Sequence, residues 1–276
     1  MKKKIFLTFT LIIAVFLMVS AVSAEGIFDW FNGDGSNADN NDKTFIVGFS
    51  DFPPFGYKDD NNEYIGFDID LAREVAKRNN WTFKAQPIIE WQTKEVELNS
   101  NVIDCIWSEF TIDGRENDYS WSEPYFNNSQ VVVVKTDSGI NSLDDLKGKI
   151  VEVQSTSSAL NAIENNKTLK DSIGQINEIS DYNTAFMNLQ SGVCDAVVVD
   201  IGSADYQIKE TYSDDTFKIL DDVLAYEKYG VAFKKGNDEL KNQVQKTLDE
   251  MYKDGTVEKI AQNYSDYGIP EGVIYP

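Results

Sequence analysis

Short apolar runs that alternate with amphipathic stretches constrain the fold of this chain more than any other feature. The runs are rich in Val, Ile and Phe and lie at residues 45–49, 103–107, 131–134, 150–153, 196–199 and 230–233. After the first run, Phe67, Leu71 and Val75 recur at helical spacing, and Asn79 ends that pattern. Strands that are apolar on both faces are typical of parallel sheets covered by helices. The pattern therefore predicts an α/β fold with mainly parallel sheets.

The candidate site residues are those that follow the predicted strands, because parallel sheets bind ligands beyond the carboxyl ends of their strands. Four such segments stand out: Ser50–Phe52, Ser108–Thr111, Ser155–Ser158 and Asp200. A cationic side chain, Arg115, follows the second segment closely. We expect these groups to meet at one edge of the fold.

The cation and the hydroxyl groups each have a ligand-binding and a structural interpretation. The guanidinium of Arg115 can grip a carboxylate through two parallel hydrogen bonds, or it can pair on the surface with Asp113 and Glu116. Ser157 and Ser158 can donate hydrogen bonds to an anion, or they can simply cap the helix that follows.

The acid and the aromatic residues are open to the same two interpretations. Asp200 can pair with an ammonium group or cap the next segment. Phe52 and Trp91 can offer flat apolar faces to a ligand, or they can belong to the core. Together, a guanidinium, N–H donors, an acid and an aromatic wall match a zwitterion such as a free amino acid.

The acidic composition and the absence of His exclude several classes of function. The chain has 276 residues, 25 Lys and Arg, 46 Asp and Glu and no His, which gives a formal charge of −21. Without His, a Ser-His-Asp triad and a His-ligated zinc site are excluded. The negative charge repels phosphate backbones, so nucleic acid is not an expected partner. No cofactor and no metal are predicted.

The amino-terminal segment is typical of an exported protein. A basic start, Lys2–Lys4, precedes an apolar run at 5–22 and small residues up to Ala24, so residues 1–24 are predicted to be a signal peptide. An uncleaved membrane anchor is the alternative, because the apolar run approaches the roughly 20 residues that a span needs. Residues 25–43 are predicted to be a flexible linker. We expect an extracytoplasmic protein, periplasmic or at the cell surface, and possible tethering at its N-terminus stays open.

The two cysteines, Cys105 and Cys194, lie at the starts of predicted buried strands. Export permits a disulfide, but two core strands in separate lobes do not easily bring their Cα atoms within the roughly 7 Å that a disulfide needs. Two buried free thiols are therefore favoured.

Several motifs resemble the extracellular solute-binding proteins of polar amino-acid ABC transporters, which have the type II periplasmic-binding-protein fold. The stretches that carry the resemblance are 47–55 with 64–71, 111–115 with 121–125, 143–149 with 153–154, and 229–236 with 254–256. The resemblance implies a two-lobed Venus-flytrap whose lobes are joined by two hinge strands. Lobe 1 would comprise 44–124 plus 230–276 and lobe 2 would comprise 125–229, with hinges near 125–129 and 225–229.

The resemblance also assigns roles to the candidate residues. Phe52 and Trp91 would stack on the ligand, and Thr111 and Arg115 would hold its α-carboxylate. The second lobe would add donors and the acid that binds the α-ammonium group, from Ser157, Ser158 and Asp200.

The chain departs from the family pattern beside Thr111. Glu109 stands where the family usually has Gly, and the spacing from Thr111 to Arg115 is shorter than usual. Glu109 can make the pocket acidic and favour a cationic side chain, or it can point outward. Ser108, at the same strand end, is also a candidate ligand contact.

The function implied is capture of a free amino acid between the lobes and its delivery to an ABC permease by a monomeric, non-enzymatic binding protein. A ligand-sensing ectodomain is one alternative. A dehydratase-like enzyme on the same fold is another, and Glu109 would be its candidate acid or base.

Overall fold

The computed structural model describes residues 43–213 and 215–276. The predicted signal peptide and all but the last residue of the predicted linker therefore lie outside the described residues. The first sheet has the strand order β4-β1-β5-β13-β6. Its strands are β1 (Thr44–Phe49), β4 (Thr82–Pro87), β5 (Cys105–Ile106), β6 (Ser120–Trp121) and β13 (Ala232–Phe233). β1 is parallel to β4 and β5, whereas β13 is antiparallel to β5 and β6.

The second sheet has the order β11-β7-β10-β8-β9, and β12 pairs with β7. Its strands are β7 (Phe126–Lys135), β8 (Ile150–Gln154), β9 (Gln175–Ile179), β10 (Ala196–Asp200), β11 (Phe217–Ile219) and β12 (Ala225–Tyr229). β8, β9 and β10 are parallel, and β7 runs antiparallel to β10, β11 and β12. The predicted α/β class is confirmed: each sheet has a parallel core, and antiparallel strands lie where the chain crosses between the sheets.

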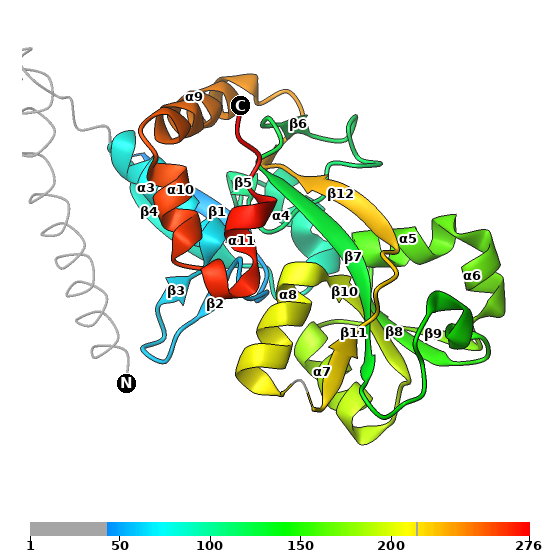
Figure 1. The fold of residues 1–276 in the computed structure, drawn as a ribbon. Helices are drawn as coiled ribbons and strands as arrows, with labels where there is room; N and C mark the ends of the chain where they lie inside the picture. The colour runs from blue at the N-terminus through cyan, green and yellow to red at the C-terminus, as the bar shows by residue number, and fades with distance from the viewer. Residues whose placement is uncertain (1–42, 214) are drawn as a thin grey trace, which may run out of the picture. The chain divides into compact units, whose positions relative to one another are not determined.

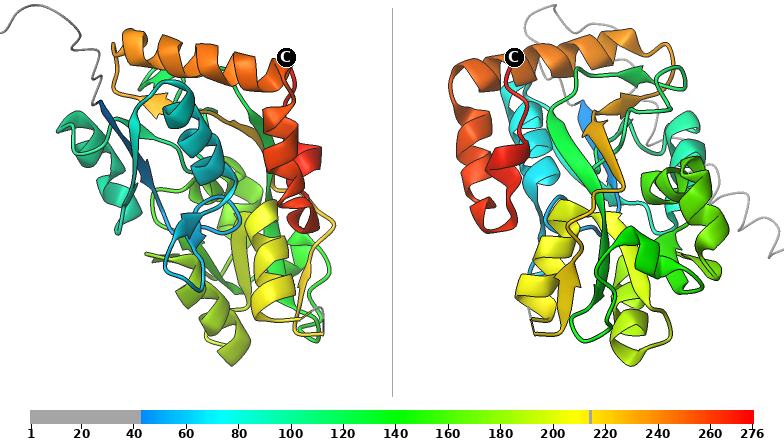
Figure 2. Two further views of the ribbon diagram at one scale, coloured as in Figure 1. Left: turned by 90° about the vertical axis from the view of Figure 1, so that its left-hand side faces the viewer. Right: turned by 45° about the vertical axis from the view of Figure 1, so that its right-hand side comes forward.

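Two adjacent strands carry the chain from one sheet to the other and back. β7 and β12 pair from Phe126 opposite Tyr229 to Gln130 opposite Ala225, and they run side by side in Figures 1 and 2. Their paired segments coincide in sequence with the predicted hinges. Movement about them stays a prediction.

Helices cover the sheets, as the spacing of apolar residues predicts. In the part of the chain that holds the first sheet they are α3 (Phe67–Arg78), α4 (Lys94–Asn99), α9 (Asp238–Lys253), α10 (Thr256–Gln262) and α11 (Ile269–Gly272), with short turns η1 (Trp91–Thr93) and η4 (Ser265–Tyr267) and the hairpin β2 (Tyr57–Lys58) and β3 (Tyr64–Ile65). In the part that holds the second sheet they are α5 (Ser158–Asn165), α6 (Lys167–Ser172), α7 (Tyr182–Ser191) and α8 (Ile201–Tyr206), with η2 (Leu143–Leu146) and η3 (Gln207–Thr211). Acids in the first turn of α3 and bases in its last turn complement the helix dipole.

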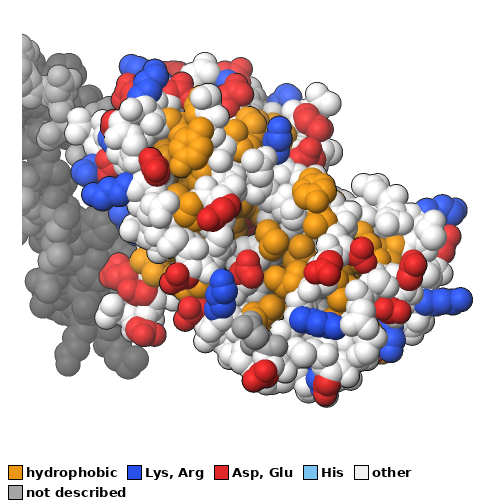
Figure 3. All heavy atoms as spheres, in the orientation of Figure 1, with side chains coloured by type: hydrophobic (Ala, Val, Ile, Leu, Met, Phe, Trp, Pro, Cys, Tyr) orange, Lys and Arg blue, Asp and Glu red, His pale blue; other side chains and the backbone are white. Residues whose placement is uncertain are grey.

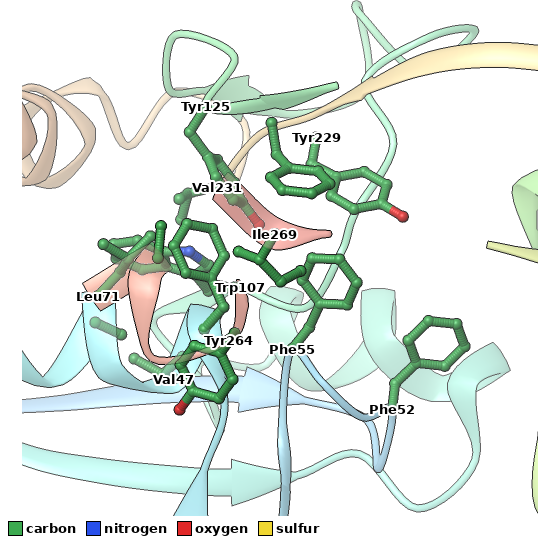
Figure 4. Close-up of a cluster of buried hydrophobic side chains, with 14 of the residues drawn as sticks. Val47, Phe52, Phe55, Leu71, Trp107, Tyr125, Tyr229, Val231, Tyr264 and Ile269 are labelled. Carbon is green, nitrogen blue, oxygen red and sulfur yellow. The ribbon is translucent and has the colours of Figure 1, made fainter. Parts of the chain in front are cut away.

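The core contains both free cysteines and a cluster of aromatic rings. Cys105 and Cys194 are buried free thiols, as predicted. Phe55 packs edge-on against Phe126 and Tyr229, with ring centroids 5.3 and 5.5 Å apart. Figure 4 shows Phe52 at the margin of this cluster, and it shows the hydroxyl of Tyr229 pointing away from the other rings. Both residues thus extend from the core toward the region of the candidate site.

The face drawn in Figure 3 carries acidic side chains scattered over it, with no single dense patch. Among the described residues, no helix is both long and apolar enough to cross a membrane.

Candidate functional site

A small cavity lies where strand ends of both sheets approach each other. Its lining includes Phe52, Trp91, Glu109, Thr111, Arg115, Ser157, Ser158 and Asp200, which are eight of the nine predicted site residues, together with the unpredicted Phe110, Gln154 and Tyr182. The cavity volume is about 20 Å³, which has room for little more than one water molecule. The ninth candidate, Ser108, lies outside the lining.

Aromatic rings form two walls of the cavity. Phe52 follows β1 and packs edge-on against Tyr182, the first residue of α7, with ring centroids 5.4 Å apart. Trp91 begins η1 and makes the same kind of contact with Phe110, also at 5.4 Å. All four rings are at most 7% exposed, so they are both core residues and walls of the site.

Arg115 is the cation that lines the cavity, and the nearby acids Asp113 and Glu116 do not pair with it. Its guanidinium donates to the carbonyl oxygens of Thr111 at 3.2 Å and Thr156 at 3.4 Å, and it lies over the Phe110 ring. It forms no ion pair with any residue in the described part of the chain, so the surface pairing with Asp113 or Glu116 is not found. Burial lowers the pKa of this group.

A second cation, Lys94, lies beside Arg115 and was not predicted from the sequence. Its ammonium group is 4.7 Å from the Trp91 ring centre and donates to the Thr156 hydroxyl at 3.3 Å. Burial, and then the charge of Arg115, lower its pKa to about 8. Thr156 itself has a φ of 58°, a left-handed conformation that is rare for a β-branched residue.

Asp200 ends β10 and is the buried acid of the cavity. It accepts hydrogen bonds from Asn128, from Gln130 at 2.8 Å and from the Tyr229 hydroxyl. Burial, and then the nearby charge of Glu227, raise its pKa to about 8. An acid, Asp200, and a cation, Arg115, thus line one cavity, and neither forms an ion pair within the described chain.

The serines after β8 include the predicted helix cap, and both also line the cavity, where ligand binding stays a prediction. Ser157 caps α5, because its hydroxyl accepts from the Leu160 N–H at 3.1 Å. Ser158, the first residue of α5, donates to Glu227 at 3.3 Å.

Glu109 adopts the backbone conformation that glycine most readily supplies, with a φ of 40°. Its N–H donates to Asp68 at 2.7 Å, and its carboxylate accepts from the hydroxyls of Ser50 and Ser108 at 3.0 and 2.8 Å. Burial and the neighbouring Asp68 raise the pKa of Glu109 well above its usual range. The side chain is therefore held inward at the cavity wall, and Ser108 supports it from behind.

No group of three or more potential metal ligands occurs among the residues that the structure describes. The arrangement is instead that of a small polar cavity with one cationic side, one acidic side and aromatic walls. Residues 45–267 match the family described as bacterial extracellular solute-binding proteins, family 3. The chain belongs to this family.

Similar proteins agree with this membership of the solute-binding proteins. The L-cystine-binding protein TcyJ of Escherichia coli K12 is 30% identical over 80% of this chain and 82% of its own length. The arginine-binding extracellular protein ArtP of Bacillus subtilis is 31% identical over 83% of this chain and 89% of its own. A Streptococcus pneumoniae ABC transporter substrate-binding protein with bound histidine has a TM-score of 0.77 at 30% identity, over 80% of this chain and 92% of that one. The two-lobed fold is thereby confirmed for this solute-binding protein.

Proposed function

We propose that this solute-binding protein captures a free amino acid between its two lobes and delivers it to an ABC importer in the membrane. The observation that carries the proposal is the placement of Arg115 and Asp200 in one cavity, each without a partner of opposite charge. An α-carboxylate would take the two donors of Arg115, with the hydroxyls of Thr111, Ser157 and Ser158 beside it. An α-ammonium group would go to Asp200.

The acids of the cavity support selection against acidic amino acids. Glu109 and Asp200 line the cavity, and burial raises the pKa of each. A ligand carboxylate at the side-chain position would disfavour ionisation of these acids further, whereas a cationic side chain would stabilise their ionised forms. The relatives named for arginine and histidine are consistent with such a preference.

Capture requires the lobes to separate, because a volume of about 20 Å³ does not hold an amino acid. We propose that the hinges lie near 125–129 and 225–229, where β7 and β12 run together. Closure would then bring the donors of the second lobe onto a ligand already bound to Arg115.

We propose that the protein performs no chemistry on its ligand, acts as a monomer, and works outside the cytoplasm after export. A sensor ectodomain and a dehydratase-like enzyme remain the competing functions. Glu109 is the candidate acid or base of the enzyme, but its carboxylate already accepts hydrogen bonds from the hydroxyls of Ser50 and Ser108.

A binding screen tests the proposal. The purified protein is heated with each of the twenty amino acids, and those that raise Tm are titrated by calorimetry. For the tightest-binding amino acid we expect 1:1 binding, recovery of unchanged ligand by mass spectrometry, and loss of binding for both its deaminated and its decarboxylated analogue. Turnover of the ligand would instead support the enzyme, and undiminished binding of both analogues would contradict the assignment of Arg115 and Asp200.

A further inference from the structure

A second buried carboxylate lies directly beside Asp200 and does not line the cavity. It is Glu227, the middle residue of β12, which is 7% exposed, while Asp200 is 6% exposed. The Nδ2 group of Asn128 donates to both carboxylates, and so does the Nε2 group of Gln130, at 2.8 Å to Asp200 and 2.7 Å to Glu227. The two acids therefore share the same pair of amide donors.

The side chains that donate hydrogen bonds to these two acids within the described residues are all neutral. Apart from the amides, Asp200 accepts from Tyr229 and Glu227 accepts from Ser158. No ion pair forms with either acid in that part of the chain. A carboxylate that is buried beside a second one is costly to ionise, and the charge of Glu227 therefore disfavours ionisation of Asp200.

The charged and titratable groups that face the pair do not remove this cost. From the other strands and loops these groups are Glu109, Arg115, Tyr182 and Tyr229. Glu109 adds to the negative potential, and the two tyrosines are neutral. Arg115 is directed to the carbonyl oxygens of Thr111 and Thr156. The raised pKa of Asp200, about 8, agrees with this geometry.

Two amide oxygens beside the pair add a second observation. Asn128 Oδ1 and Gln130 Oε1 are buried and have no hydrogen-bond partner, although both residues are at most 3% exposed. The region is thus rich in acceptors and poor in donors and positive charge. An alkylammonium group, with three N–H donors and a positive charge, supplies what the region lacks.

We propose that Glu227 is a positioning residue that couples amino-acid binding to proton release: beside Glu227, Asp200 keeps a proton until the ammonium group of an amino acid enters, and that proton then passes to the solvent. Glu227 acts through Asp200 and the shared amides. The inference rests on the proposed function, because it assumes an amino-acid ligand.

Calorimetry on the whole protein tests the proton balance. The probe is L-arginine, or L-glutamine if the screen shows no arginine binding, since neither side chain changes charge between about pH 5 and pH 8. Binding is measured at about pH 7 in phosphate and in Tris, whose different ionisation enthalpies report the protons released. We expect close to one proton per bound amino acid, and a value near zero with binding retained overturns the proposal.

The pH profile then tests the role of Glu227. For the wild type, affinity should rise about tenfold per pH unit between about pH 5 and pH 7, because one proton is released. Glu227→Gln should flatten this slope to less than about twofold per unit, and Glu227→Asp should preserve it. Glu258→Gln removes an equal charge from the exposed face of α10 and should leave the slope unchanged.

The failures of the two proposals are distinguishable. A wild-type slope that persists in Glu227→Gln overturns the role of Glu227 while amino-acid binding stands. Absence of binding by any amino acid overturns both. If Glu227→Gln does not fold, two measurements still test the proposal. They are the number of protons released by the wild type and the pH dependence of affinity in Glu227→Asp.

Discussion

Single side chains in the cavity have two tasks, because each is part of the core and part of the wall. Phe52, Trp91 and Ser157 pack or cap, as their structural interpretation requires, and they also face the cavity. The sequence alone therefore could not separate these interpretations. Each of the four candidate strand-end segments contributes residues to the cavity lining, since the topology of an α/β sheet places those ends together.

Some of the residues that the sequence did not reveal are polar groups within strands. Asn128, Gln130 and Glu227 are buried, although they lie in segments whose neighbours alternate with exposed positions. A polar residue at a core-facing position of an alternating strand indicates a buried polar group. Recognising such a position requires knowing which face is buried, and that information comes from the packing of the two sheets.

The first prediction concerns Arg115. Replacement by Ala should weaken amino-acid binding at least about 30-fold, because the α-carboxylate would be left buried without its cation. Calorimetric titration of the variant measures this loss. Arg73→Ala removes an exposed arginine of α3 that pairs with Asp70, and should keep affinity within about twofold. Affinity within twofold in Arg115→Ala would place the ligand elsewhere.

At the scale of elements, the sequence predicted best the strands that lie inside the sheets. β1, β8, β10 and the centre of β7 follow from continuous apolar runs, and their residues are mostly buried. β4 and β9 lie at sheet edges and mix polar with apolar residues. Their pattern is weak because one face and one edge meet solvent, so no apolar run marks them.

A close approach at the start of α3 gives the second prediction. Gly66 has a φ of 125°, and a Cβ there would lie 2.2 Å from the Phe55 carbonyl oxygen. Gly139 also has a positive φ, of 75°, but nothing lies within 4 Å of the corresponding position. Gly66→Ala should therefore lower the free energy of unfolding by roughly 2 to 4 kcal/mol more than Gly139→Ala.

Urea denaturation of both glycine variants, followed by circular dichroism, measures the difference. Gly139→Ala measures the cost of a positive φ without a contact, about 1 kcal/mol. Gly66 also has a ψ of 163°, a conformation that essentially only glycine adopts, which adds to its expected loss. Equal losses in the two variants would show that the contact with Phe55 relaxes freely.

For the whole molecule, buried acids make stability depend on pH in an unusual direction. Asp68 is fully buried and accepts from the Glu109 N–H and the Tyr125 hydroxyl. Burial raises its pKa to about 7 from the usual 3.8. Between these values the folded state binds more protons than the unfolded chain. Its contribution to stability is therefore complete below about pH 4 and is lost as pH rises through about 7.

The third prediction follows from that sign. The free energy of unfolding of the protein without added amino acid should fall between about pH 5 and pH 8, with at most about 3 kcal/mol from Asp68. Urea denaturation at constant ionic strength measures it. Asp68→Asn should reduce the slope, whereas Asp137→Asn, at an exposed position after β7, should not. A slope that is the same in all three proteins would assign the effect to other groups.

The contacts of Thr156 determine how the cavity responds to salt concentration. Lys94 donates to the hydroxyl of Thr156, and Arg115 donates to its carbonyl oxygen. Thr156 is uncharged and lies on the opposite side of the cavity. Such contacts join a charge to a dipole, and dissolved ions screen them less than they screen paired opposite charges. The two sides of the cavity should therefore stay together at high salt concentration as well as in dilute buffer.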